Sequence, residues 1–176
     1  MSTHPEKSME SPTFESTRWR IDPARSRVEF EVPHNWGLSR VRGRFTRYDG
    51  TLALADDPAL VLTIEAASLD TKSKYRDKHL RSAEFFDADN HPHPRFVSER
   101  VELDGERLTV RGRLHAAGKS VPLEIDATLT ADGDELEVEA FTDVDQRLLG
   151  MTWSPLGIAR TPTRLLVHAR LVRDAG

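Results

Sequence analysis

The chain of 176 residues contains no cysteine. This absence excludes disulfide bonds, thiolate catalysis and zinc or iron–sulfur centres that use cysteine ligands. The chain also lacks an apolar run near the roughly 20 residues that a transmembrane helix needs. Lys and Arg together number 25 against 29 Asp and Glu, a formal net charge of −4, whereas nucleic-acid-binding domains usually carry a basic stripe. We therefore expect no transmembrane segment and no nucleic-acid partner.

The first residues are polar and rich in Ser, Glu and Pro. They lack the apolar core of a secretory signal, so the sequence as given predicts a cytoplasmic protein. Segments of this composition cannot bury enough apolar surface to fold. We interpret residues 1–17 as a disordered polar tail and residues 18–174 as a single domain, which is long enough to bury a core.

From Trp19 onward, apolar and polar residues alternate, which is the period of a half-buried β-strand. Val28, Phe30 and Val32 face one way, for example, with charged residues between them. Around eight such runs are joined by short turns. Closure of the sheet removes the exposed edges that invite aggregation, and an eight-stranded barrel can hold one small ligand. The predicted fold is all-β, an extended antiparallel eight-stranded β-barrel.

One stretch, residues 71–86 (TKSKYRDKHLRSAEFF), does not alternate. Asp70, Thr71 and Ser73 are each suited to cap a helix, because their side-chain oxygens accept from free backbone N–H groups. We expect a short helix at about 72–82 that lies at the mouth of the barrel. Phe85 and Phe86, which follow the helix, are predicted to form a lid or wall of the cavity together with it.

Several segments in order resemble the YceI family, the lipocalin-like polyisoprenoid-binding proteins, and the resemblance covers about residues 18–173. It is carried by Trp19-Arg20-Ile21-Asp22-Pro23, Val41-Arg42-Gly43-Arg44-Phe45, Ser68-Leu69-Asp70-Thr71, Arg76-Asp77, His79-Leu80-Arg81-Ser82, Phe85-Phe86-Asp87, Pro94, Phe96 and Ser98. The resemblance implies a lipocalin-like barrel whose cavity takes a long isoprenoid or other lipid tail, often on a quinone. It implies no catalytic residues.

The sequence departs from the family pattern at two places. Arg25 stands where family members usually carry His, and Arg147-Leu148-Leu149-Gly150 replaces an Arg-x-Asp-Phe-Gly pattern. Because an aspartate and an aromatic residue are lost, the choice of ligand is the property these changes affect.

The predicted function is binding of a long-chain isoprenoid lipid or isoprenoid quinone inside the barrel, as a carrier or storage protein and not as an enzyme. No cofactor is required, and the expected partner is an amphiphilic isoprenoid or fatty ligand; a homodimer is compatible with the sequence. No metal site is expected, because Pro92 and Pro94 hold His91 and His93 in a loop and no cluster of further ligands is evident. The predicted ligand-binding residues are Phe30, Val32, Val41, Phe45, Leu62, Ile64, Phe85, Phe86, Phe96, Val110, Leu114, Leu123, Ile125, Leu149, Met151 and Val167.

Two alternatives remain open. A small hydrolase or isomerase acting on a lipophilic substrate would use His79 with Asp77, since a histidine beside a carboxylate is the usual general base. No Gly-x-Ser-x-Gly nucleophile motif accompanies this pair, and we favour Arg76, Asp77 and His79 as polar rim residues that fasten the helix by pairing with neighbouring strands. The other alternative is a protein-interaction module with a filled barrel, which predicts no cavity large enough for a chain.

Overall fold

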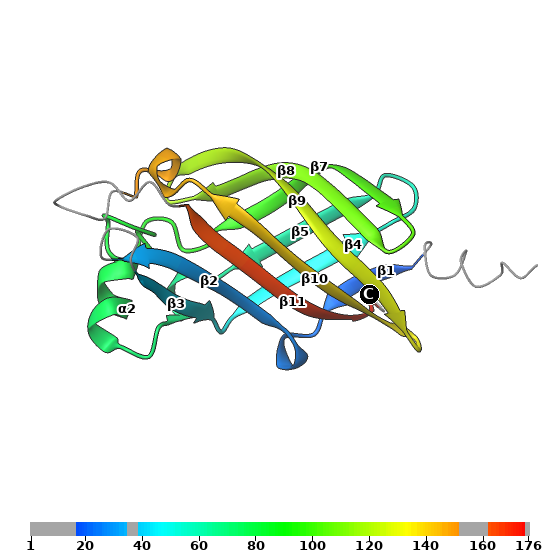
Figure 1. Ribbon diagram of the computed structural model, residues 1–176, viewed down its shortest axis with the longest axis horizontal. Coiled ribbons are helices and arrows are strands. Elements are labelled where there is room, and N and C mark those ends of the chain that lie inside the picture. The colour runs from blue at the N-terminus through cyan, green and yellow to red at the C-terminus, as the bar shows by residue number, and fades with distance from the viewer. Residues whose placement is uncertain (1–16, 35–38, 152–161, 175–176) are drawn as a thin grey trace, which may run out of the picture.

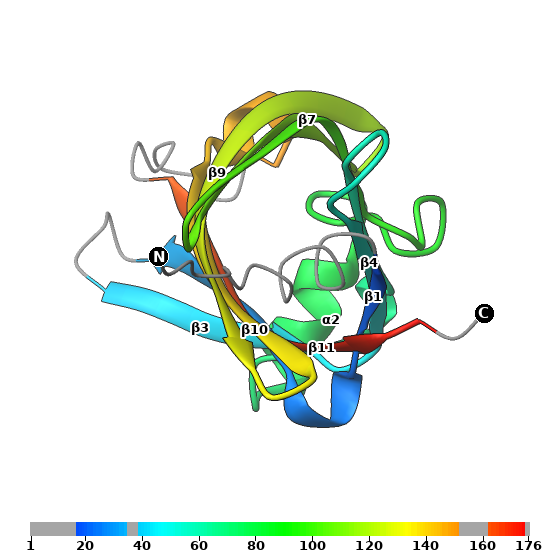
Figure 2. The same cartoon turned by 90° about the vertical axis from the view of Figure 1, so that its right-hand side faces the viewer.

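Eight antiparallel strands close into a ring in the structure, a computed structural model that describes residues 17–34, 39–151 and 162–174 (Figures 1 and 2). Pairing of the first strand with the last closes the ring, so the predicted eight-stranded barrel is confirmed. In order around the ring, the strands are β1 (Arg18–Ile21), β4 (Tyr48–Ala53), β5 (Ala59–Ile64), β7 (Arg95–Asp104), β8 (Arg107–Ala116), β9 (Lys119–Asp132), β10 (Glu135–Val144) and β11 (Thr163–Arg173).

Three further strands extend the sheet from β11. These are β2 (Arg27–His34), β3 (Ser39–Phe45) and the two-residue β6 (Leu69–Asp70). The first part of β11 pairs with β2, and its last part pairs with β1. A 3-10 turn at Pro23–Arg25 separates β1 from β2, so both strands use the same edge of β11 at different heights.

The strands follow the alternation of the sequence. In β8 every second residue from Leu108 to Ala116 is buried, while the residues between them are exposed or half-buried. Charged residues on the outer face pair across neighbouring strands, as Arg111 does with Glu124. The hairpin turns after Asp104 and Asp132 place glycines at positive φ, which the Asp-Gly signals of the sequence predict.

Two glycines inside strands allow close approach on the inner face. A Cβ added at Gly112 would lie 2.3 Å from the carbonyl oxygen of Val97, and one at Gly43 would lie 2.4 Å from the ring of Phe30. Gly112 faces the neighbouring strand close to the bulge of β7 at Ser98. Glycine at these positions lets a backbone and an aromatic ring pass where any side chain would clash.

The predicted helix is present as α2 (Lys74–Arg81), two residues shorter at its start and one at its end than expected. Ser73 is the cap, because its side chain accepts from the N–H of Arg76. The helix lies at one end of the barrel, opposite the end where β1 begins (Figure 1). Among the helices of the described residues, none is long and apolar enough to cross a membrane.

Candidate functional site: the apolar lumen of the barrel

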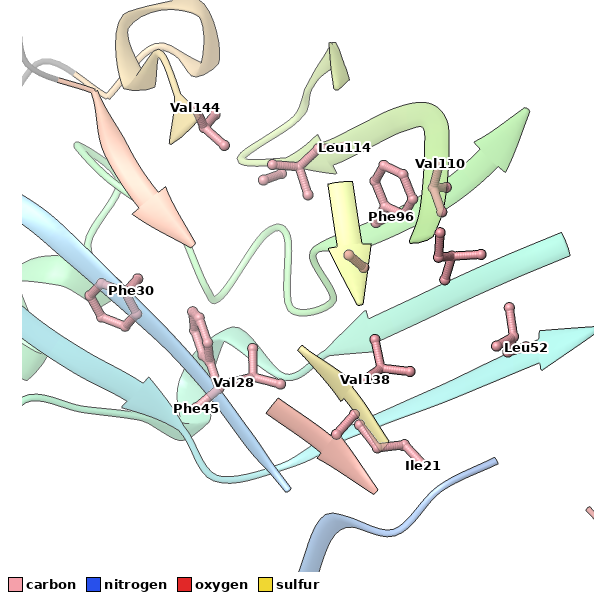
Figure 3. Packing of buried hydrophobic residues seen from close by; sticks show 14 of the residues in the cluster. Ile21, Val28, Phe30, Phe45, Leu52, Phe96, Val110, Leu114, Val138 and Val144 are labelled. Atoms are coloured by element: carbon pink, nitrogen blue, oxygen red, sulfur yellow. The ribbon is translucent and has the colours of Figure 1, made fainter. Parts of the chain in front are cut away.

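A cavity of about 140 Å³ lies inside the barrel. It is lined by nine of the predicted ligand-binding residues, namely Phe45, Leu62, Ile64, Phe96, Val110, Leu114, Leu123, Ile125 and Val167. Its other lining residues are Ile21, Val28, Gly50, Thr51, Leu52, Leu60, Val61, Leu108, Ala127, Val138, Ala140, Phe141, Thr142, Leu165, Ala169 and Leu171. Figure 3 shows several of these side chains pointing into the space between the walls.

The lining of this cavity is almost entirely hydrocarbon. Among the described residues, the lining includes two threonines, Thr51 and Thr142, and no charged residue. A charged or strongly polar ligand group would lose its hydration here without gaining partners. The lumen is therefore suited to an apolar chain or ring.

The barrel is not filled by its own side chains at mid-height. Leu62, Ile125 and Val167 point inward with their strand faces, yet they are only half-buried. They border the cavity, so the accessible part of each side chain faces the lumen. These side chains pack against the core on one side and leave the other side open to the lumen, a space that a ligand can fill with a gain in free energy.

Large side chains close the lumen at the end where β1 begins, hereafter the β1 end. Trp19, Leu129 and Leu136 are 2%, 2% and 0% exposed. All three come from strands of the closed ring, whose backbones are paired on both sides. This end is packed as a protein core.

The opposite end, hereafter the α2 end, is closed by an aromatic cluster. The ring of Phe30 lies 5.2 Å from that of Phe45 and 6.2 Å from that of Phe86, and the last two rings are 5.6 Å apart. Phe86 follows helix α2, and the other two rings come from β2 and β3. The cluster joins the segment after the helix to the strands that extend the sheet.

Seven predicted ligand-binding residues lie outside the cavity lining. Phe30, Phe85, Leu149 and Met151 are buried at the α2 end, while Phe86, Val32 and Val41 are half-buried there. Their contact with a ligand stays a prediction. The alternation of the sequence marks missed lining residues such as Leu52 and Leu108 as inward, but it carries no signal for the height of the cavity.

The polar residues of α2 contact the segment that precedes the helix. Asp77 Oδ1 accepts from the backbone N–H of Thr71 at 2.8 Å and from its hydroxyl at 2.6 Å, and Arg76 donates to the carbonyl of Thr71 at 3.1 Å. The ring of His79 packs edge-on against Phe85 at 5.1 Å. Within the part of the chain that is described, no hydrogen bond joins His79 to Asp77. The contacts fasten the helix, but to Thr71 and not to a strand of the ring.

The histidines of the loop before β7 have few other possible metal ligands near them. His91 lies 3.9 Å from Asp87, and no group of three or more metal-ligating side chains occurs in the described residues. A larger hollow of about 710 Å³ lies on the outer wall, but charged residues such as Arg27, Glu29 and Arg107 line it. Its open, ionic surface makes the lumen the better candidate site.

Arg25, one departure from the family pattern, joins two distant parts of the chain. Its guanidinium donates to both carboxylate oxygens of Glu135, at 3.0 and 2.9 Å, and to Asp22 at 2.7 Å. These hydrogen bonds lower the pKa of both carboxyls below their ordinary values. Histidine cannot make this fork of contacts with two carboxylates, so the substitution ties the turn after β1 to the start of β10.

The second departure forms a turn at the α2 end. Arg147 donates to Asp145 at 2.9 Å and thereby lowers the pKa of that carboxyl. Leu149 is buried, Leu148 is 62% exposed, and Gly150 adopts a left-handed conformation with φ of 76°. The residues that follow, 152–161, lie outside the described part of the chain.

Fold and site together define a closed antiparallel β-barrel with an apolar internal cavity. The chain belongs to the YceI-like domain family, whose sequence model matches residues 19–171. It is 37% identical over 112 residues to protein YceI of Escherichia coli O157:H7 and 38% identical over 112 residues to a UPF0312 protein of Pectobacterium atrosepticum. Each match covers 61% of this chain and 58% of the relative, so the matched part spans less than two thirds of these curated relatives.

Solved structures show the same fold at low sequence identity. BcnA of Burkholderia cenocepacia superposes with a TM-score of 0.77 at 19% identity, over 85% of this chain and 98% of that one. A polyisoprenoid binding domain from Saccharophagus degradans gives a TM-score of 0.71 at 13% identity, over 89% and 98% of the two chains. The recognised family and the barrel architecture are thus confirmed.

Proposed function

We propose that this protein binds a long-chain isoprenoid lipid or an isoprenoid quinone in the lumen and acts as its carrier or store. The observation that carries the proposal is the unfilled apolar cavity at mid-height, bordered by half-buried inward residues of the ring. A fold shared with a polyisoprenoid binding domain supports the choice of ligand class.

The lining predicts how affinity and specificity are divided between tail and head group. Each buried CH₂ group contributes about 0.8 kcal/mol, so an apolar tail supplies most of the binding free energy. Among the described lining residues, the polar side chains are those of Thr51, which is exposed, and Thr142, whose hydroxyl donates to the carbonyl of Glu124. Discrimination among head groups is therefore expected to be weak.

The size of the cavity sets a condition on binding. Its volume of about 140 Å³ is close to that of an engineered apolar cavity of about 150 Å³ that accepts benzene. Without rearrangement, the lumen thus has room for one ring or about one isoprene unit. A longer chain requires the lining side chains to change rotamer or one end of the barrel to open.

The geometry of α2 supports binding more than catalysis. The carboxylate of Asp77 is engaged by Thr71, and the ring of His79 packs on Phe85. A general base must reach the proton that it removes. A His79→Ala variant that lost turnover of a lipophilic ester while keeping its bound lipid would instead favour the hydrolase alternative.

The direct test is extraction of purified protein followed by mass spectrometry, with uptake of an isoprenoid quinone measured on delipidated protein. A matched pair of variants locates the site. Ala140→Phe puts a benzyl group into the cavity, whereas Ala59→Phe makes the same change at an exposed position of β5.

We expect the wild type and the Ala59 variant to take up the quinone and the Ala140 variant to lose uptake while remaining folded. Protein that carries no lipid and takes up no isoprenoid would overturn the proposal. Equal uptake by both variants would place binding outside the lumen.

A further inference from the structure

Helix α2 carries a concentration of positive charge that contrasts with the rest of the chain. Residues 72–81 contain five Lys or Arg and one Asp, whereas the remaining residues contain twenty Lys or Arg and twenty-eight Asp or Glu. Three of the five lysines of the protein lie in this short segment. The exposed lysines of this segment, called the basic face below, are Lys72, Lys74 and Lys78; Arg76 is also exposed, but it lies about 200° around the helix from Lys74 and donates to the carbonyl of Thr71.

The basic face is not neutralised as the barrel wall is. On the wall, arginines pair with acids of neighbouring strands, for example Arg20 with Asp49 and Arg164 with Asp143. The cations of the basic face have no acidic partner among the described residues. The acid within the helix, Asp77, is turned toward Thr71.

Helix stability does not explain this arrangement. Cations are favourable in the last turn of a helix, but Lys72 and Lys74 lie at its start, where the helix dipole repels them. Lys74 and Lys78 are also spaced i, i+4, and like charges at that spacing destabilise a helix. An external anionic partner would relieve both unfavourable interactions.

Exposed apolar side chains accompany the basic face. Tyr75, next to Lys74, is 83% exposed, and Leu148 is 62% exposed. Leu148 belongs to the 3-10 turn Gln146–Leu149 after β10, which lies at the same end of the barrel as α2 (Figure 1). Tyrosine beside lysine is typical of groups that sit at the level of lipid head groups.

We propose that the α2 end docks on an anionic lipid bilayer through the basic face, with Tyr75 and Leu148 at the head-group level. This inference rests on the proposed function: a long-chain isoprenoid is dissolved in a membrane and not in water, so a protein that binds one has to reach the membrane. Docking at this end brings the aromatic cluster of Phe30, Phe45 and Phe86 to the surface from which a ligand would enter.

The test is flotation of the delipidated full chain with vesicles free of isoprenoids, made either of phosphatidylcholine alone or with about 30% phosphatidylglycerol. We expect binding to the anionic vesicles only, and release at high salt, because surface charges are screened. A lysine near an anionic surface contributes about fivefold to affinity, so Lys74→Gln with Lys78→Gln should weaken binding about 30-fold.

The matched control is Arg100→Gln with Arg107→Gln, which removes the same charge from exposed side chains away from α2. It should bind within about twofold of the wild type, and Tyr75→Ser should bind severalfold more weakly. All substituted side chains are exposed, and unchanged melting temperatures verify folding.

Several outcomes would contradict docking. These are no binding to anionic vesicles, equal binding to neutral ones, or equal loss in the control pair. If the protein bound single-stranded RNA or an acidic polypeptide but not the vesicles, the basic face would be a site for a macromolecule, and the proposal of membrane docking would be wrong. If vesicle docking fails, quinone uptake by the delipidated protein is unaffected. Conversely, the Ala140→Phe variant, whose lumen is blocked, should still float with the vesicles. The two proposals can therefore be refuted separately.

Discussion

The two ends of the barrel are closed by different kinds of structure. At the β1 end, Trp19, Leu129 and Leu136 are held by strands that are hydrogen-bonded on both sides. At the α2 end, a one-helix insertion and an aromatic cluster close the lumen, and β6 pairs with β3 through only Leu69 and Asp70. Local opening requires the fewest broken backbone hydrogen bonds where pairing is shortest. The β1 end is therefore expected to contribute more to the stability of the fold, and the α2 end is expected to open more readily.

The largest expected difference between the ends comes from large-to-small substitutions. Trp19→Ala should lower the free energy of unfolding by about 3–5 kcal/mol, because it leaves a cavity in a packed core. Phe86→Ala should lower the free energy of unfolding clearly less, because Phe86, at the α2 end, is only half-buried. Urea denaturation measures both. Equal losses would show that the two ends are equally important to stability and contradict the distinction between them.

Glycine substitution compares the ring with the strands that extend it. In Gly112→Ala the new Cβ meets the backbone of β7, whereas in Gly43→Ala it meets the ring of Phe30. Overpacking costs about 1–3 kcal/mol, and we expect the larger loss at Gly112 because backbone yields less than a side chain. Thermal unfolding tests this order, and a larger loss at Gly43 would contradict it.

The fastening of α2 is tested by Asp77→Ala. This change leaves the N–H and hydroxyl of buried Thr71 without their acceptor, at a cost of about 1–3 kcal/mol. Hydrogen exchange should accelerate in residues 70–86 and stay unchanged in β8 and β9. Lys78→Ala, on the exposed side of the same helix, is the control. Uniform acceleration throughout the barrel would mean that the helix is part of the global unfolding unit.

The smallest effect concerns pH near the β1 end. The pKa values of Asp22 and Glu135 are lowered by hydrogen bonds to Arg25. A carboxyl with a lowered folded-state pKa stabilises the fold above its unfolded pKa of about 4, and the contribution is lost as the pH falls through the folded value. Arg25→Gln should therefore reduce the fall in melting temperature between pH 6 and pH 3.

A parallel substitution extends this test to the α2 end. Arg147→Gln removes the partner that lowers the pKa of Asp145. Both pairs are exposed to solvent, so each change should be small. If neither variant altered the acid limb of the stability curve, the ion pairs would not contribute to folding.

Only pairing in three dimensions reveals the partner of Arg25. Nothing in the sequence near this residue indicates Glu135, which lies 110 positions away and meets it through the pairing of β11 with its neighbours. The same applies to β11 itself, which serves β1 and β2 in turn. Alternation in the sequence identifies a strand and its inner face, but it does not show which other strands pair with it.

Alternation by itself determined which side chains point inward, because the period of a strand is two wherever the strand lies. The break at residues 71–86 and the cap at Ser73 likewise determined where the helix begins, since capping is a local contact. The tertiary structure decided which inward residues border a void and which pack against each other. Leu136 is fully buried and lies outside the cavity lining, whereas Leu123 is half-buried and lines the cavity, although both alternate alike. The difference depends on the height of each residue in a closed ring, and that height is set by side chains from several strands at once.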